Sequence, residues 1–169
     1  IVKAASESDQ VVVVVSAVGG ITDKLMGASQ KAIENNLNYK NDFIKVKQQH
    51  IEIIEGLLSG VRLSETKDVI LEKLAELEKL LDGVFLINEL SPKTTDKLLS
   101  FGELMSSLII FEAMQDYGLN VQLKNSQNLI VTDSNFTNAA VQFEETNANI
   151  ISYFEHNKKM VTILPGFIS

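Results

Sequence analysis

The sequence predicts an α/β fold: a mostly parallel sheet with an inserted helical hairpin. Three observations support this. Five consecutive valines, 11–15, precede a glycine pair and a helix start, which together make half of a β-α-β unit. Residues 40–90 show apolar positions at helical spacing and no strand pattern, and a short apolar strand returns at 160–164. We assign one domain to residues 1–169, with the helical insertion at about 40–90.

The first predicted unit is a strand, a loop and a helix. Residues 10–16 form a continuous β-branched run, which is typical of a strand buried on both faces. Residues 17–21 form a short loop that contains two adjacent glycines. Thr22 or Asp23 is then expected to cap a helix that runs to about residue 35.

The second unit is a pair of helices separated at Ser59-Gly60. Its apolar positions recur three and four residues apart in two seams: Phe43, Val46, His50, Ile53 and Leu57, then Ile70, Leu74, Leu77, Leu81 and Val84. Such seams suit either a helical hairpin or a surface for partner helices. Each seam is shorter than three heptads, which favours packing within the chain. We therefore interpret His50 as a hydrogen-bonded packing residue of the seam.

The remaining elements follow from capping signals and short apolar runs. Ser91-Pro92 begins and Gly118 ends a long helix predicted over 93–117. The expected elements after it are strands at 121–123 and 129–132, a helix at 143–154 and the strand at 160–164. Lys158-Lys159 is interpreted as a solvated turn.

Composition excludes several classes of function. Fifteen basic against 22 acidic residues give a net charge of −7, so we expect no nucleic-acid and no membrane partner. Cysteine is absent, and the two histidines lie far apart in sequence, so we expect no metal site. The longest apolar run is too short to span a bilayer, and we see no signal peptide. A cytoplasmic location is the expectation, and both ends resemble cuts within a longer polypeptide.

The loop after the first strand is the first candidate binding element. Ligands of open α/β sheets gather beyond the carboxyl ends of the strands. Gly19 and Gly20 allow a ligand to approach the backbone there, and the next helix offers free N–H groups to an anion. The loop matches neither a Walker loop nor G-x-G-x-x-G. On its own such a glycine pair is weak evidence for a ligand site, and a simple tight turn between strand and helix is its more frequent explanation.

The long helix carries the second candidate element, S-F-G-E-L-M-S-S at 100–107. Its small and polar residues surround one carboxylate, Glu103, while Leu104, Leu108 and Phe111 continue an apolar face. Glu103 lies too far from the helix N-terminus to be explained by the helix dipole. It could receive a ligand ammonium group, or it could face solvent above a helix contact made by small residues.

Three segments, in this order, resemble the aspartate kinases. They are V-V-V-S-A-V-G-G-I-T-D-K-L at 13–25, S-F-G-E-L-M-S-S at 100–107 and L-P-G-F-I-S at 164–169. The stretch 129–141 is similar as well, so the resemblance spans essentially the whole chain. It implies part of the three-layer amino-acid-kinase sandwich. It also implies transfer of the γ-phosphoryl group of ATP, with Mg²⁺, to the β-carboxylate of L-aspartate, in a protein that forms homo-oligomers at full length.

The resemblance also assigns roles to individual residues. Those implied to contact or shape the substrate site are Ser16 and Thr22 for aspartate, Glu103 for its α-ammonium, Phe167 for the pocket wall, and Gly19 and Gly20 for the loop near the phosphates. No catalytic residue is implied within this chain. The family's K-F-G-G-T-S loop is expected upstream, and its G-R-G-G-S-D segment downstream.

The missing segments predict that the isolated chain is inactive. The aspartate carboxylate is already ionised at neutral pH, so the reaction needs positioning and positive charge rather than a base. The sequence has a single arginine, Arg62, within the helical insertion. The alternatives are another amino-acid or carbamate kinase of the same fold, or a non-catalytic helical interaction module. The sequence leaves open whether the parent is fused to a homoserine dehydrogenase and which end product inhibits it.

Overall fold

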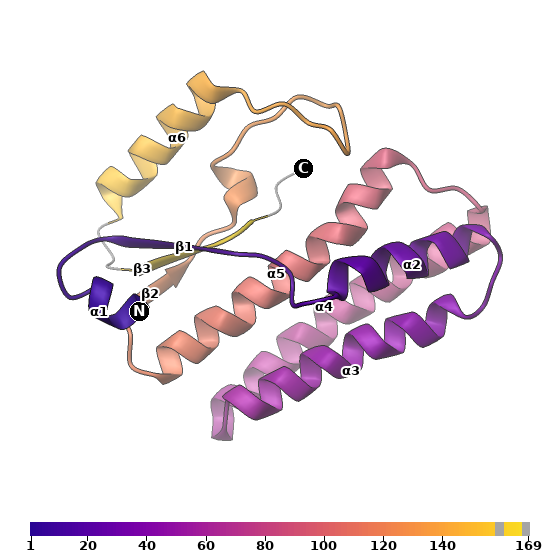
Figure 1. Ribbon diagram of the computed structural model, residues 1–169, viewed down its shortest axis with the longest axis horizontal. Helices are drawn as coiled ribbons and strands as arrows, with labels where there is room; N and C mark the ends of the chain where they lie inside the picture. The colour runs from indigo at the N-terminus through magenta and orange to yellow at the C-terminus, as the bar shows by residue number, and fades with distance from the viewer. Residues whose placement is uncertain (158–160, 167–169) are drawn as a thin grey trace.

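A computed structural model describes residues 1–157 and 161–166. It contains a small sheet joined to a cluster of long helices (Figure 1). The elements in chain order are α1 (Val2–Ala5), β1 (Val11–Val15), α2 (Ile21–Ile33), α3 (Tyr39–Leu57), α4 (Gly60–Ile87), α5 (Pro92–Asp116), β2 (Val121–Leu123), the 3₁₀ helix η1 (Ser126–Asn128), α6 (Phe143–His156) and β3 (Val161–Pro165). The predicted α/β class, the parallel sheet and the helical hairpin are confirmed.

The sheet has the order β1-β3-β2, and both pairings are parallel. Val11 and Val121 both lie opposite Val161, so the three strands run in register from one end. Because they are parallel, all three end at the same edge of the sheet, where the backbone N–H of Gly166 donates to Val15 O at 2.9 Å. This edge is where a ligand site is expected.

The prediction that the first strand is buried on both faces is wrong for the described residues. Val12 and Val14 are 45% and 66% exposed, whereas the alternate valines pack toward α5. A β-branched run signals a strand but does not reveal how many layers cover it. β1 is the edge strand of the described sheet, and one of its faces is open.

The helical insertion is a hairpin, as predicted, and its second seam is correct at every position. All five residues of that seam, Ile70 to Val84, are buried in the helical core. In the first seam, Ile54 and Leu58 take the buried places expected for Ile53 and Leu57. Helical spacing allows either choice, and packing against α2 and α4 selects the second. The seams therefore lie inside the molecule.

Polar contacts close the open end of this hairpin. The Tyr39 hydroxyl at the start of α3 donates to Asp82 Oδ1 near the end of α4, at 2.6 Å. Burial and this acceptor raise the pKa of Tyr39 to about 12. The Tyr39 ring also stacks at a tilt on Phe85, with 5.2 Å between centroids. The two long helices are thus fixed at both the turn and the open end.

Three other expectations need correction or fall outside the described residues. The N-cap residue of α2 is Gly20, which has φ +75°, and no side chain caps the helix, so neither Thr22 nor Asp23 caps it. Residues 129–132 form no strand: Thr132 makes only an isolated bridge to Val141, after η1. Lys158, Lys159 and Met160 lie outside the described residues. By contrast, Ser91 caps α5 by accepting from the Thr94 N–H at 3.2 Å.

α5 is the element shared by the two halves of the molecule. One side of it packs into the helical core with α2, α3 and α4, and the other covers the sheet through Ile110, Phe111 and Met114. By length and composition it is apolar enough to cross a membrane. Here that apolarity is used on two sides of a protein core, and Figure 1 shows α5 running between the sheet and the other helices.

Candidate functional site

The connection from β1 to α2 is a tight turn that requires glycine. The Ile21 N–H donates to Val18 O at 2.9 Å, and Gly20 adopts φ +75° and ψ 3° at the third position of the turn. These angles are those of a type II turn, which a side chain would strain. Both Gly19 and Gly20 are exposed, and an added Cβ would meet nothing within 4 Å at either position. The turn leaves the loop surface open to a ligand.

The α5 helix touches this connection at Gly102. A Cβ built on Gly102 would lie 2.8 Å from Ala17 Cβ, closer than side-chain atoms pack, and 3.4 Å from Ile21 Cγ2. The small residue in the middle of the helix therefore permits the close approach of α5 to the end of β1. The tight contact explains why glycine occurs in a helix interior, where it costs stability.

Glu103 follows directly and faces the same connection. Its carboxylate is partly buried, and backbone groups of Glu103 itself and of Ala17 lie close to it. Burial raises the pKa of Glu103 above its ordinary value, and the interactions with these two backbone groups oppose that rise. Of the two interpretations of Glu103, the structure favours the half-buried carboxylate beside the loop over a fully solvent-facing one.

The other predicted site residues lie around this contact. Ser16, the first residue after β1, is exposed, and Thr22 is exposed in the first turn of α2. The α2 N-terminus has no side-chain cap, and the Ile21 N–H is used in the turn, so the N–H groups of Thr22 and Asp23 are the ones available to an anion. Phe167 lies outside the described residues. The roles given to Ser16, Thr22, Glu103, Gly19 and Gly20 remain predictions, although their segments meet at one edge of the sheet.

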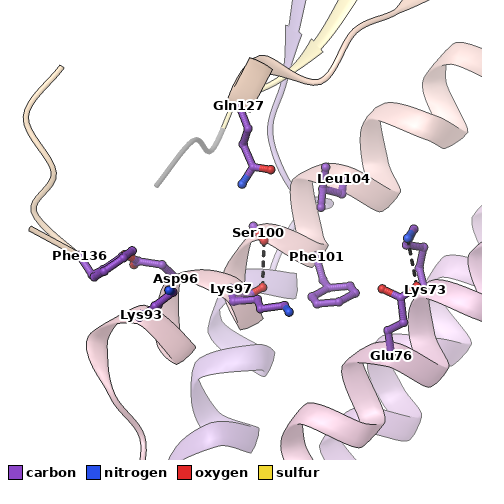
Figure 2. Close-up of a pocket in the computed structure, with 10 residues that line it drawn as sticks. All are labelled: Lys73, Glu76, Lys93, Asp96, Lys97, Ser100, Phe101, Leu104, Gln127 and Phe136. Carbon is purple, nitrogen blue, oxygen red and sulfur yellow. Dashed lines mark hydrogen bonds and ion pairs between the residues drawn. The ribbon is translucent and has the colours of Figure 1, made fainter. Parts of the chain in front are cut away.

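A separate cavity of about 300 Å³ lies between α4, the first half of α5 and the loop after η1 (Figure 2). Its wall includes Ser100, Phe101 and Leu104 of the second motif, but Glu103 is not among the lining residues. The buried carboxylate of Asp96 closes one side by accepting the Thr137 N–H at 2.6 Å. The cavity is therefore distinct from the candidate loop.

The cationic side chains near the site are few. Arg62 is held by α5, since its guanidinium pairs with Glu112 at 2.5 Å and with Asp116 at 3.5 Å. Lys24, in the first turns of α2, donates a hydrogen bond from its ammonium group to Gln49 Oε1. It has no ion pair within the described ranges. Among the described residues, no three His, Asp or Glu side chains lie together as a cluster that could hold a metal ion.

His50 lies next to this lysine and is fully buried, as a packing residue should be. Its Nδ1 bonds to Val46 O at 2.8 Å, while Nε2 has no partner among the residues that the structure describes. Burial, with the Lys24 charge, lowers the pKa of His50. The expectation of a fully hydrogen-bonded histidine is therefore only half right, because one ring nitrogen lacks a protein partner.

A parallel sheet with a glycine turn and a carboxylate at its carboxyl edge is an arrangement typical of α/β proteins, whose ligand sites lie at that edge. The model of the amino acid kinase family matches residues 1–169, and the chain belongs to that family. Aspartokinase 1, chloroplastic, of Arabidopsis thaliana is 31% identical over 134 residues, which are 77% of this chain and 22% of that protein. The bifunctional aspartokinase/homoserine dehydrogenase of Buchnera aphidicola is 24% identical over 100% of this chain and 21% of that protein.

Solved structures show the same fold. E. coli aspartokinase III in complex with aspartate and ADP matches with a TM-score of 0.81 and 21% identity, over 96% of this chain and 36% of that chain. The same enzyme with lysine and aspartate matches with a TM-score of 0.78. The chain spans about a fifth of the length of the curated relatives described above. The predicted amino-acid-kinase fold is confirmed.

We expect Gly102→Ala to destabilise the protein by about 1–3 kcal/mol, because the new methyl group overpacks against the rigid Ala17 Cβ. Urea unfolding measures the change. Gly83→Ala in α4 is the matched control, since nothing lies within 4 Å of its added Cβ. That control should be stabilised by about 0.5–1 kcal/mol through helix propensity. Equal effects of the two substitutions would contradict the close contact.

The raised pKa of Glu103 means that its ionised form destabilises the folded state. The folded state keeps the proton to a higher pH than the unfolded state, so stability falls as the pH rises through and above the ordinary pKa of 4.5. We expect Glu103→Gln to gain unfolding free energy relative to wild type between pH 4 and pH 7. Urea unfolding at the two pH values tests this, with exposed Glu144→Gln as the control. A relative loss at pH 7 would refute it.

Proposed function

We propose that this chain forms part of an aspartate kinase, which transfers the γ-phosphoryl group of ATP to the β-carboxylate of L-aspartate. The observation that carries the proposal is the contact of Glu103 with the backbone of Ala17, which brings the second motif to the loop of the first. A zwitterionic amino acid needs such a pairing: a carboxylate for its ammonium group, and hydroxyls and backbone N–H groups for its acidic groups. The names of the relatives support this substrate.

In the proposed site, Glu103 receives the α-ammonium group of aspartate. Ser16 and Thr22 contact the substrate from the two ends of the loop, and Gly19 and Gly20 let the backbone approach the phosphates. Phe167 is assigned to the pocket wall. The half-buried setting of Glu103 strengthens its attraction for a cation, because the surroundings are less polar than water.

The proposed reaction requires positive charge that these residues do not supply. The attacking carboxylate is ionised at neutral pH, so no base is needed. The activation barrier is lowered mainly by positive charge that stabilises the phosphoryl oxygens in the transition state. Arg62 is neutralised by two carboxylates of α5, at a distance from the loop along the helical layer. We therefore propose that the catalytic cations come from other parts of a longer protein. ATP with Mg²⁺ is its proposed co-substrate, and no residue of this chain is assigned to the metal.

The remaining attributes of the parent are proposals as well. We propose a homo-oligomer in the cytoplasm, acting in amino-acid biosynthesis that leads to lysine, threonine and methionine. The net charge of −7 opposes binding to nucleic acid or to an anionic membrane. The rival kinase of the same fold differs in its substrate, so relative turnover of aspartate and glutamate separates the two.

We expect the full-length protein, but not the isolated 169-residue chain, to release ADP in the presence of aspartate. A coupled ADP-release assay on both measures this, with glutamate as the competing substrate. Aspartate-dependent turnover by the isolated chain would show that it contains its own catalytic cations. Preference for glutamate would favour the rival kinase.

We expect Glu103→Gln in the full-length protein to raise the KM for aspartate by about 10- to 100-fold. The reason is the loss of a charged hydrogen bond to the ammonium group, worth about 1.5–3 kcal/mol. Steady-state kinetics with varied aspartate measure the change, and the KM for ATP should move much less. Glu144→Gln on α6 serves as the control. An unchanged KM for aspartate would remove Glu103 from the site.

A further inference from the structure

One side chain of the helical insertion reaches the glycine turn. Gln49 lies on α3, and its Nε2 donates to Gly19 O at 3.1 Å. Its Oε1 accepts from Lys24 Nζ at 2.5 Å. A single amide thus joins three elements: the turn before α2, the first turns of α2 and the middle of α3. The hydrogen bond from Lys24 to Gln49 is partly buried, whereas the bond from Gln49 to Gly19 O lies at the exposed surface.

The glycine turn has little else to hold it on this side. Neither glycine has a side chain, and nothing lies within 4 Å of the space where one would be. Glycine loses more conformational freedom on ordering than any other residue. Gly20 O accepts from Lys24 N at 3.2 Å and Val18 O from Ile21 N, which leaves Gln49 as the donor to Gly19 O within the described part of the chain.

The position of this turn determines the position of the candidate substrate contacts. Thr22 follows the turn by two residues, and Ser16 precedes it by three. The Gly102–Ala17 contact fixes the strand side of the connection, through α5. Gln49 fixes the opposite side, through α3. The helical insertion and the long helix therefore hold the loop from two directions.

We propose that Gln49 is a positioning residue, which orders the glycine turn for the substrate and couples the helical insertion to the site. It acts through Gly19 and Lys24 and touches no substrate itself. The substrate part of this inference rests on the proposed function, whereas the ordering of the turn does not. Loss of the amide should loosen the turn before a ligand binds, so the substrate must then order it.

The test compares Gln49→Ala and Gln49→Glu in the full-length protein. The alanine variant removes both hydrogen bonds. The glutamate variant keeps an acceptor for Lys24 but cannot donate to Gly19 O, so it isolates the contact with the turn. Gln48→Ala is the matched control, because Gln48 is the exposed neighbour on the same helix and its side chain forms no hydrogen bond with the described residues.

The first measurement is amide hydrogen exchange of the peptide covering 16–23, without ligands. We expect exchange to speed up by about 3- to 10-fold in both Gln49 variants and to stay unchanged in Gln48→Ala, at equal melting temperatures. That range corresponds to the loss of one hydrogen bond of ordinary strength. Unchanged exchange in the Gln49 variants would overturn the proposal, whatever the enzyme does.

The second measurement is steady-state kinetics. We expect the KM for aspartate to rise about 3- to 10-fold in both Gln49 variants, with kcat within about twofold of wild type. A purely structural loss would lower the melting temperature and the active fraction instead of raising KM. Faster exchange with an unchanged KM would overturn the positioning role. Absence of aspartate-dependent turnover in wild type would refute the proposed function. Faster exchange in the Gln49 variants would then still support the ordering of the glycine turn by Gln49.

Discussion

The candidate site depends on one close contact, the packing of the Gly102 backbone against Ala17. Because no Cβ stands between them, α5 approaches the end of β1 more closely than any larger residue would allow. This approach brings the Glu103 carboxylate to the backbone of Ala17 and leaves it half buried. Without it, the two motifs would lie on neighbouring elements but would not form a shared site.

The same contact links two cores through one helix. α5 packs into the helical cluster on one side and covers the sheet on the other. Two of its polar side chains, one near each end of the helix, make defined contacts with other segments. Glu112 holds Arg62 of α4, and Asp96 holds the backbone of Thr137. A displacement of α5 would therefore change the helical layer, the sheet and the candidate site together.

The distribution of charge indicates that different parts of the proposed kinase bind the amino acid and stabilise the transferred phosphoryl group. The described residues around the turn offer a carboxylate, hydroxyls and backbone N–H groups, which suit recognition of an amino acid. The nearest cation of the turn, Lys24, is bound to the neutral amide of Gln49, and the single arginine is neutralised elsewhere. Phosphoryl transfer needs concentrated positive charge. In the proposed kinase, recognition of the amino acid is therefore the part of the reaction that we assign to these residues.

The sequence by itself determined the elements that depend on local spacing. These elements are the seam of α4, the Ser91 cap, the end of α5 just before Gly118 and the strand-turn-helix around the valines. They follow from periodicity and from the conformations that particular residues favour. The tertiary structure decided whatever depends on residues distant in the chain. The open face of β1, the choice of Ile54 over Ile53, the contact of Ala17 with Glu103 and the reach of Gln49 to Gly19 are such cases. Local spacing limits which side of an element can be buried, but only the packed neighbours determine what it meets.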